Sequence, residues 1–402
     1  MTGDRIFVYG VARTPFGKFQ GQLSGYSAAA LGAAAINEVL ARSSLPASAI
    51  DSVLIGQGMI GGAALTVGRQ AVLYSDLPET TPSLGLDRAC CSGMSSVAVA
   101  MAELRNGTMA NALICGGLES LSTTPRLLPR KIPLTGDAGF EDPLLLNSPF
   151  SDGSIARYTS EEALKFGVDR AAQDEWALKS HARYFAAEDR GFFAFERFAL
   201  QAMPASDRLD PSMVIADESP RRDSDLEKLS RLSPVRGSTT ITAGNAPGLS
   251  DGAAFMLIGG SSVAARFGAT PLAEIVATVR VAEGPTSGTR TPAIAIQKLL
   301  AACHLRIEQI DAIEINEAFA ATPLVSTLVL AGSDVRLAEK LRRITNQNGG
   351  SVAIGHPMGA SGARIISTLI NQLRSRGGGL GVAAICGGFG QGEAVLIKMD
   401  GG

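Results

Sequence analysis

Two adjacent thiols, Cys90 and Cys91, lie in the turn DRACCSG, between an apparent strand and the helix-like segment SSVAVAMAELRNG. A thiol at the N-terminal end of a helix meets the positive end of the helix macrodipole, which favours the nucleophilic thiolate. We therefore treat Cys90 as a candidate nucleophile. Taken alone, the pair is more typical of small buried residues in a tight turn, so other segments must decide.

The chain has three histidines, and they differ in their surroundings. His356 lies in the glycine-rich segment GGSVAIGHPMGASG, which leads into the helix-like ARIISTLINQLRSR. His181 and His304 lie within or near the end of predicted helices, where a solvated or dipole-complementing imidazole is the more ordinary interpretation. Only His356 is therefore a candidate catalytic base.

Two further candidates follow predicted strands. Asn316 begins NEAFA directly after the apolar AIEI, and Cys386 begins CGGFG after AAI. Open α/β sheets place ligands at the carboxyl ends of their strands, where an amide can hold a water or an oxyanion. Each motif alone also fits a structural interpretation: Asn316 as a helix cap, and Cys386 as a core cysteine beside a hairpin turn.

Strands alternate with helices along much of the chain, which predicts a layered α/β fold. Strands are expected at 5–11, 52–58 and 111–117, and a helix at 27–42. ALICGG (112–117) is echoed by AAICGGFG (383–390). This echo puts Cys90 and His356 at comparable points of two related halves.

The chain of 402 residues is longer than a single core usually supports. We expect residues 1–119 and 246–272 to form an N-terminal α/β half and residues 273–402 a C-terminal half. The proline-punctuated stretch 120–245 is predicted to be an inserted loop domain.

Composition excludes several classes of protein. A formal net charge of -2 gives no overall attraction to nucleic acid or to an anionic membrane, so neither is expected as a partner. The five cysteines include no C-x-x-C pair, which gives no indication of a metal site. The N-terminus lacks a signal-like apolar run, and we expect a soluble cytoplasmic protein.

Several segments together resemble the thiolase family, in the family's order and nearly end to end. They are VARTPFGKF (11–19), the Cys-x-Ser-Gly around Cys90, GGLESLS (116–122), TAGNAPGLSDGAA (242–254), NEAFA (316–320), GHPMGASGAR (355–364) and CGGFG (386–390). The resemblance implies a thiolase fold: two similar α/β halves packed as αβαβα layers, with the loop domain inserted. It implies CoA-dependent cleavage of 3-ketoacyl-CoA, or condensation of two acyl-CoA molecules, through an acyl-cysteine.

The resemblance also implies roles for the candidate residues. Cys90 would take the acyl group, with His356 as its base, and Cys386 would move the proton at the α-carbon. His356 and a water on Asn316 would stabilise the enolate oxygen. The backbone N–H groups of Cys90 and Gly388 would form a second oxyanion hole.

Coenzyme A is implied as a substrate, with no tightly bound cofactor and no metal. It would lie across the loop domain, where Arg221 would contact the nucleotide end; Arg221 alone would be interpreted as a solvated charge. Ala243, Ala246 and Pro247 would line the pantetheine channel, and Ala156 the acyl pocket. Pro247 stands where many members have serine, and Asp87 where many have asparagine.

Acyl-CoA and 3-ketoacyl-CoA are therefore the expected partners, with assembly into a homodimer or homotetramer. Chain length and physiological direction stay open. A ketosynthase would normally need a second histidine where NEAFA stands, and a decayed scaffold should have lost a catalytic position. A redox role for Cys90 and Cys91 is disfavoured, because vicinal disulfides are strained.

Overall fold

The computed structural model describes residues 5–59, 65–106, 111–128, 141–150, 153–205 and 212–401. Its strands fall into two groups. In the N-terminal group the spatial order is β1 (Ile6–Arg13), β8 (Ser250–Gly260), β5 (Ala112–Ser120), β3 (Ser52–Gly56) and β4 (Ser83–Leu86), with the short β2 (Gly17–Lys18) beside β8. In the C-terminal group it is β9 (Ala273–Ala282), β12 (Gln391–Met399), β11 (Gly379–Gly387) and β10 (Ala312–Ile315).

The two groups share one topology. β8 runs antiparallel to both β1 and β5, and β3 pairs with β5 in parallel. β9, β12 and β11 likewise alternate, and β10 pairs with β11 in parallel. The predicted relationship between the halves is therefore confirmed, and the echoed hexapeptides lie on the equivalent strands β5 and β11.

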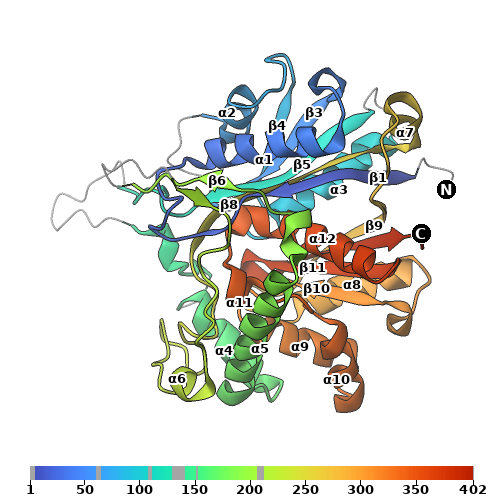
Figure 1. Ribbon diagram of the computed structural model, residues 1–402. Helices are drawn as coiled ribbons and strands as arrows, with labels where there is room; N and C mark the ends of the chain where they lie inside the picture. Colours follow the sequence, from blue (N-terminus) through green and yellow to red (C-terminus); the bar gives the residue numbers. More distant parts are fainter. Residues whose placement is uncertain are drawn as a thin grey trace.

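Helices and strands form five layers, as predicted (Figure 1). One outer layer holds α1 (Ala28–Ser43) and α2 (Val67–Leu73), and the other holds α8 (Thr291–Ala302), α9 (Ala321–Leu330) and α10 (Val335–Ile344). Between the two strand layers lie α3 (Ser92–Arg105) and α12 (Met358–Ser375). The strand layers are also joined at their edges, because β1 pairs with β9 at Ile6 and Ile275, so that both groups form one continuous sheet.

The middle helix α12 is buried on every side along most of its length, as its position between two strand layers requires. Its first turns carry small residues. A Cβ on Gly93 would lie 2.3 Å from the carbonyl oxygen of Gly359, and one on Gly362 would lie 2.4 Å from the Met94 nitrogen. These glycines therefore let α3 and α12 cross with their backbones in contact.

The described part of 120–245 contains α4 (Ile155–Lys165), α5 (Arg170–Asp189), α6 (Leu226–Ser230) and a separate two-stranded sheet of β6 (Leu200–Gln201) and β7 (Met213–Val214). Within this stretch, 129–140, 151–152 and 206–211 lie outside the described residues. α4 and α5 pack against α9, and α5 also against α11 (Ser351–Ile354). The short α7 (Ser261–Phe267) follows β8. Across the described ranges, no helix is long and apolar enough to span a bilayer.

A buried ion-pair group ties β1 to the inserted segment. Arg13 donates to Glu196 at 2.6 Å and to both carboxylate oxygens of Asp217 at 2.7 and 3.0 Å, and all three side chains are fully buried. Removing one partner of such a group leaves uncompensated charge in a place that water does not reach.

We expect Arg13→Met to lower the free energy of unfolding by about 3–5 kcal/mol, because the buried carboxylate of Glu196 loses its paired cation and Asp217 keeps only Arg197. The midpoint of urea denaturation, followed by circular dichroism, measures this. Arg5→Met is the matched control, because it breaks an exposed pair with Glu274 and should change the midpoint little. Equal shifts in the two variants would contradict the assignment.

Candidate active site

The crossing of α3 and α12 brings together the first turns of both helices, and with them Cys90 and His356. Nε2 of His356 lies 3.2 Å from Sγ of Cys90. The two residues precede equivalent helices of the two halves, which explains how segments 266 residues apart meet. The contact that the sequence predicts is therefore present.

The turn that presents Cys90 has an unusual backbone. Ala89 has φ of +50°, a conformation that non-glycine residues rarely adopt. Ser92 holds the turn closed, because its hydroxyl accepts from the Arg88 N–H at 2.8 Å and donates to the Ala89 carbonyl oxygen at 2.6 Å. Such strain is typical of functional turns that the surrounding structure over-determines.

Ser361 sets the tautomer of His356. Its hydroxyl lies 2.6 Å from Nδ1 and donates to the Pro357 carbonyl oxygen at 3.3 Å, so it is left to accept a hydrogen from Nδ1. Nε2 then carries a free lone pair toward the Cys90 thiol, as a general base requires. The sequence interpretation missed Ser361, although it lies on the first turn of the helix that follows His356.

Burial makes the resting pair neutral. It lowers the pKa of His356 to about 3, and the charge of Arg364 acts in the same direction. Burial also raises the pKa of the Cys90 thiol, with further increases from Cys386 and Glu119. Burial of the thiol thus opposes the thiolate that the sequence led us to expect at the helix terminus, and it favours a resting pair in which the proton stays on Cys90.

Cys386 ends β11 and is buried close enough to Cys90 to affect its charge. Burial raises the pKa of Cys386 to about 12, so its thiol stays protonated near neutral pH. The glycines after it allow close packing. A Cβ on Gly387 would lie 2.9 Å from Sγ of Cys91, and one on Gly388 would lie 3.4 Å from Cβ of Ala89. Gly388 thus lies beside the nucleophile turn.

Asn316 follows β10, as predicted, and its N–H donates to the Ala384 carbonyl oxygen at 2.9 Å. Its side-chain Oδ1 accepts from the Ser351 hydroxyl at 2.7 Å. Its Nδ2 is buried without a hydrogen-bond partner among the described residues. A buried amide donor with an open position is suited to hold a water or an oxyanion.

Glu119, in the GGLESLS segment, is a second functional candidate that the sequence interpretation did not single out. Its carboxylate accepts from the backbone N–H groups of Gly58, Met59 and Gly359 at 2.8, 3.2 and 3.0 Å. Burial raises its pKa to about 7, although these donors favour the charged form. Glu119 therefore fixes loop backbone next to the start of α12.

The segment 242–254 reaches the site. His356 donates its backbone N–H to the Gly248 carbonyl oxygen at 3.3 Å and to Oγ of Ser250 at 3.2 Å. Earlier in the segment, Ala243 is exposed, Pro247 is half-buried, and Ala246 packs on an apolar cluster. Ala156 is buried in the same cluster, which is separate from the apolar cluster around Cys90.

Arg221 is exposed, and its backbone N–H donates to Nδ1 of His181 at 3.2 Å. His181 is itself buried, which corrects the interpretation of this residue as a solvated imidazole. Burial lowers its pKa to about 4, with the charge of Arg221 acting the same way. A polar-looking helix therefore turns one of its faces inward, and His181 supports the loop that carries Arg221.

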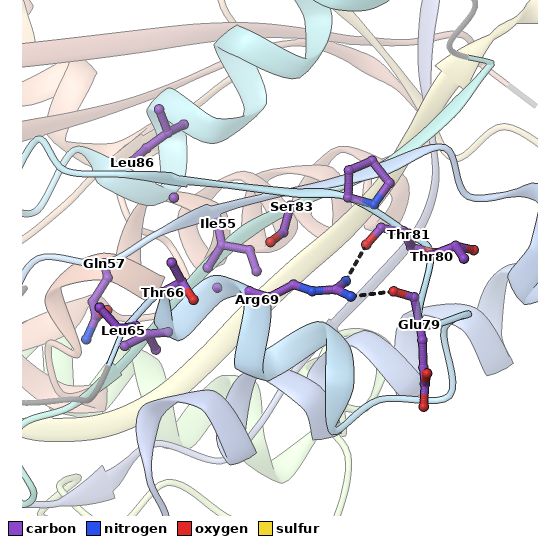
Figure 2. A pocket seen from close by; sticks show the side chains of 14 residues that line it. Ile55, Gln57, Leu65, Thr66, Arg69, Glu79, Thr80, Thr81, Ser83 and Leu86 are labelled. Atoms are coloured by element: carbon purple, nitrogen blue, oxygen red, sulfur yellow. Dashed lines mark hydrogen bonds between the residues drawn. The ribbon is translucent and has the colours of Figure 1, made fainter.

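A cavity of about 1000 Å³ lies away from these residues, between α2 and β4 at the outer edge of the sheet (Figure 2). Arg69 crosses it and donates to the Thr81 and Glu79 carbonyl oxygens. The candidate catalytic groups do not line it. In the ranges that the structure describes, no cluster of three or more His, Cys, Asp or Glu residues could hold a metal.

The low pKa of His356 has a direct consequence for pH dependence. Because the imidazole stays neutral down to about pH 4, the rate at which p-nitrophenyl acetate acylates Cys90 should stay level between about pH 5 and pH 8. An ordinary histidine would lose about 30-fold over that range. The mass of the Cys90 peptide gives the rate, and Cys90→Ser controls for labelling elsewhere. A decline with a midpoint near pH 6.5 would overturn the assignment.

The sequence and the fold of this chain are similar to those of several known proteins. Profiles of the thiolase N-terminal and C-terminal domains match residues 6–262 and 269–399. A probable acetyl-CoA acetyltransferase of Mycolicibacterium smegmatis is 38% identical, over 96% of this chain and 98% of that protein. A beta-ketoadipyl-CoA thiolase of Pseudomonas aeruginosa is 35% identical, over 98% of each.

Solved structures extend the likeness to three dimensions. An acetyl-CoA acetyltransferase of Bacillus anthracis superposes with a TM-score of 0.91 at 29% identity, covering 98% of this chain and 99% of that one. Human mitochondrial 3-ketoacyl-CoA thiolase gives a TM-score of 0.91 at 32% identity, covering 98% of each chain. With both domain profiles matched and relatives aligned almost end to end, the chain belongs to the thiolase family.

Proposed function

We propose that this thiolase catalyses the reversible, CoA-dependent cleavage of 3-ketoacyl-CoA through an acyl thioester on Cys90. The 3.2 Å contact between Nε2 of His356 and Sγ of Cys90 carries the proposal, because it pairs a neutral base with a nucleophile. The reverse direction, condensation of two acyl-CoA molecules, uses the same groups. Metabolite levels would decide which direction prevails.

Cleavage begins when His356 takes the Cys90 proton and the sulfur attacks the 3-keto carbon. The backbone N–H groups of Cys90 and Gly388 are the proposed donors to the resulting oxyanion. The bond between C2 and C3 then breaks, leaving the acyl group on Cys90 and an enolate of acetyl-CoA. The thiol of the next CoA attacks the thioester, and Cys90 recovers its proton from His356.

The carbon-carbon step needs a proton at C2, which we assign to Cys386. Its protonated thiol can donate to the enolate carbon and then recover a proton from the incoming CoA thiol. The enolate oxygen would be stabilised by His356 and by a water on Nδ2 of Asn316. The unpartnered amide donor supports this role.

CoA acts as a substrate in this scheme, and no tightly bound cofactor is required. We place its pantetheine arm along Ala243, Ala246 and Pro247, because the segment that contains them continues to His356. Arg221 would meet the nucleotide end, and its exposed side chain is free to do so. Ala156 stays a proposed neighbour of the acyl group on the family resemblance alone, since the apolar cluster it shares with Ala246 is separate from the one around Cys90.

An apolar acyl group fits the immediate surroundings of Cys90. Cys90 packs on a cluster of buried Leu121, Leu144 and Met358, with Phe19, Met59 and Leu249 partly buried beside them. We therefore propose acetoacetyl-CoA and longer apolar 3-ketoacyl-CoA as substrates. The relatives named above include acetyl-CoA, β-ketoadipyl-CoA and 3-ketoacyl-CoA enzymes, so the family name alone does not choose among them.

Separate half-reactions test the two thiols. Cys90→Ala should abolish both acylation by acetyl-CoA and cleavage of acetoacetyl-CoA. Cys386→Ala should still acylate Cys90 but lose about 100-fold or more in cleavage and in exchange of acetyl-CoA methyl protons in D₂O, because the C2 proton has lost its carrier. Mass spectrometry follows the first reaction, and NMR the exchange.

Cys303→Ala is the matched control, since this partly exposed thiol follows α8 and contacts none of the proposed groups. It should leave every rate unchanged. Cleavage that survives Cys90→Ala would refute the assigned nucleophile, and normal exchange in Cys386→Ala would refute the assigned acid.

We also propose that the chain forms a homodimer, alone or within a tetramer, through the edge of the sheet at β4. This strand has no partner on its outer side among the described strands. Apolar side chains cluster beside it: Leu84 is 43% exposed, and Leu73 and Tyr74 on α2 are 50% and 62% exposed. An uncovered apolar edge is a ready site for pairing with another copy.

Leu84→Lys should shift the protein toward monomer, because dimerisation would bury an unpaired charge. Sedimentation equilibrium across a concentration series measures the change. Leu164→Lys is the control: this leucine on α4 is 48% exposed but lies far from β4 in sequence and layer, so its replacement should leave assembly unchanged. A Leu84→Lys variant that still assembles like the unmodified protein would exclude this edge.

A further inference from the structure

A buried hydroxyl lies between a buried cation and the Asn316 amide. The Ser351 hydroxyl, at the start of α11, accepts from Nη2 of Arg364 at 3.0 Å and donates to Oδ1 of Asn316 at 2.7 Å. All three side chains are fully buried. Arg364 lies on α12 and Asn316 follows β10, so this chain of hydrogen bonds joins three elements of the C-terminal half.

The direction of these hydrogen bonds follows from the chemistry of the first member. A guanidinium can only donate, so Arg364 occupies one lone pair of the Ser351 oxygen. The hydroxyl hydrogen is then directed to the remaining neighbour, which must accept it. Asn316 therefore turns Oδ1 toward Ser351, and Nδ2 points the other way.

The reversed amide would be unfavourable here. It would direct Nδ2 at the Ser351 oxygen and strand the hydroxyl hydrogen without its acceptor in a buried place. It would also replace the free donor by an oxygen, which repels a developing oxyanion rather than stabilising it. The orientation of one amide thus decides whether the site can stabilise negative charge.

Arg364 also faces an acidic side chain. Its Nη1 lies 3.8 Å from Oε2 of Glu314, which lies on β10 two residues before Asn316. Burial raises the pKa of Glu314 to about 8, so its carboxyl is largely protonated near neutral pH. β10 and the residue after it therefore carry both the acid that faces Arg364 and the amide that Arg364 orients through Ser351. The amide's backbone is fixed independently, by the hydrogen bond from Asn316 N–H to Ala384.

We propose that Ser351 and Arg364 are positioning residues that lock the Asn316 amide with its donor facing the enolate oxygen. The inference rests on the proposed thiolase reaction, and it assigns the enolate step, rather than acyl transfer to Cys90, as the step that depends on Ser351. Neither residue touches the substrate in this account. Their effect passes entirely through Nδ2 of Asn316.

Ser351→Ala should lower methyl-proton exchange of acetyl-CoA in D₂O by about tenfold, as expected when one orienting hydrogen bond is lost. Acylation of Cys90 by acetyl-CoA, measured as the mass of its peptide, should stay within about twofold. Ser367→Ala is the matched control, because it removes a buried hydroxyl on α12 whose one partner among the described residues is the Ala363 carbonyl oxygen. In Ser367→Ala, the rate of methyl-proton exchange and the rate of Cys90 acylation should either fall by the same factor or both stay unchanged.

A double-mutant comparison excludes a merely structural role. Asn316→Ala should lower exchange by about 100- to 1000-fold, and adding Ser351→Ala should then cost nothing further, because the amide it orients is gone. Ser351→Thr keeps the hydroxyl and should restore exchange, and it serves as the second variant if Ser351→Ala lowers the melting temperature sharply.

The outcomes separate the inference from the function on which it rests. If the unmodified protein shows neither exchange nor Cys90 acylation, the proposed function fails. If the unmodified protein shows both activities, either of two results would overturn the inference alone. One is a normal exchange rate in Ser351→Ala. The other is an equal further loss of exchange when Ser351→Ala is added to Asn316→Ala. An equal loss of acylation and exchange in Ser351→Ala would also overturn it.

Discussion

The contact between Nε2 of His356 and Sγ of Cys90 is the geometric basis of the proposed chemistry. It exists because two related halves place a glycine-containing turn before equivalent helices, and because those helices cross without side chains between them. Gly93 and Gly362 leave no room for a Cβ at the crossing. The duplicated topology therefore places the imidazole of one half beside the thiol of the other half.

Burial then decides the charge state of the site. His356 and both reactive thiols are neutral at rest, so proton transfer between them creates charge only as the reaction proceeds. Two serines direct the available donors and acceptors. Ser361 leaves the lone pair of Nε2 facing the thiol, and Ser351 leaves the amide donor of Asn316 open. A small set of directed hydrogen bonds therefore prepares the site before any substrate binds.

Much of the fold could be predicted from the sequence where hydrophobic periodicity and a recognisable motif fall on the same segment. The strands expected at 52–58 and 111–117 overlap β3 and β5, and the helix expected at 27–42 matches α1 within a residue. The burial of His181 was predicted wrongly, because it depends on segments packed from elsewhere in the chain. Ser351 and Ser361 carry no periodic signal, since their roles come from the direction of a hydrogen bond.

In the proposed reaction the acyl group passes through Cys90 while His356 holds its proton. Rapid quenching of the protein with acetoacetyl-CoA, followed by mass spectrometry of its peptides, shows where the acyl group goes. We expect an acetyl group on the Cys90 peptide within the first turnover, which free CoA removes at the rate of turnover. Cleavage of acetoacetyl-CoA with no acetyl group on Cys90, or with the group on Cys386 instead, would contradict it.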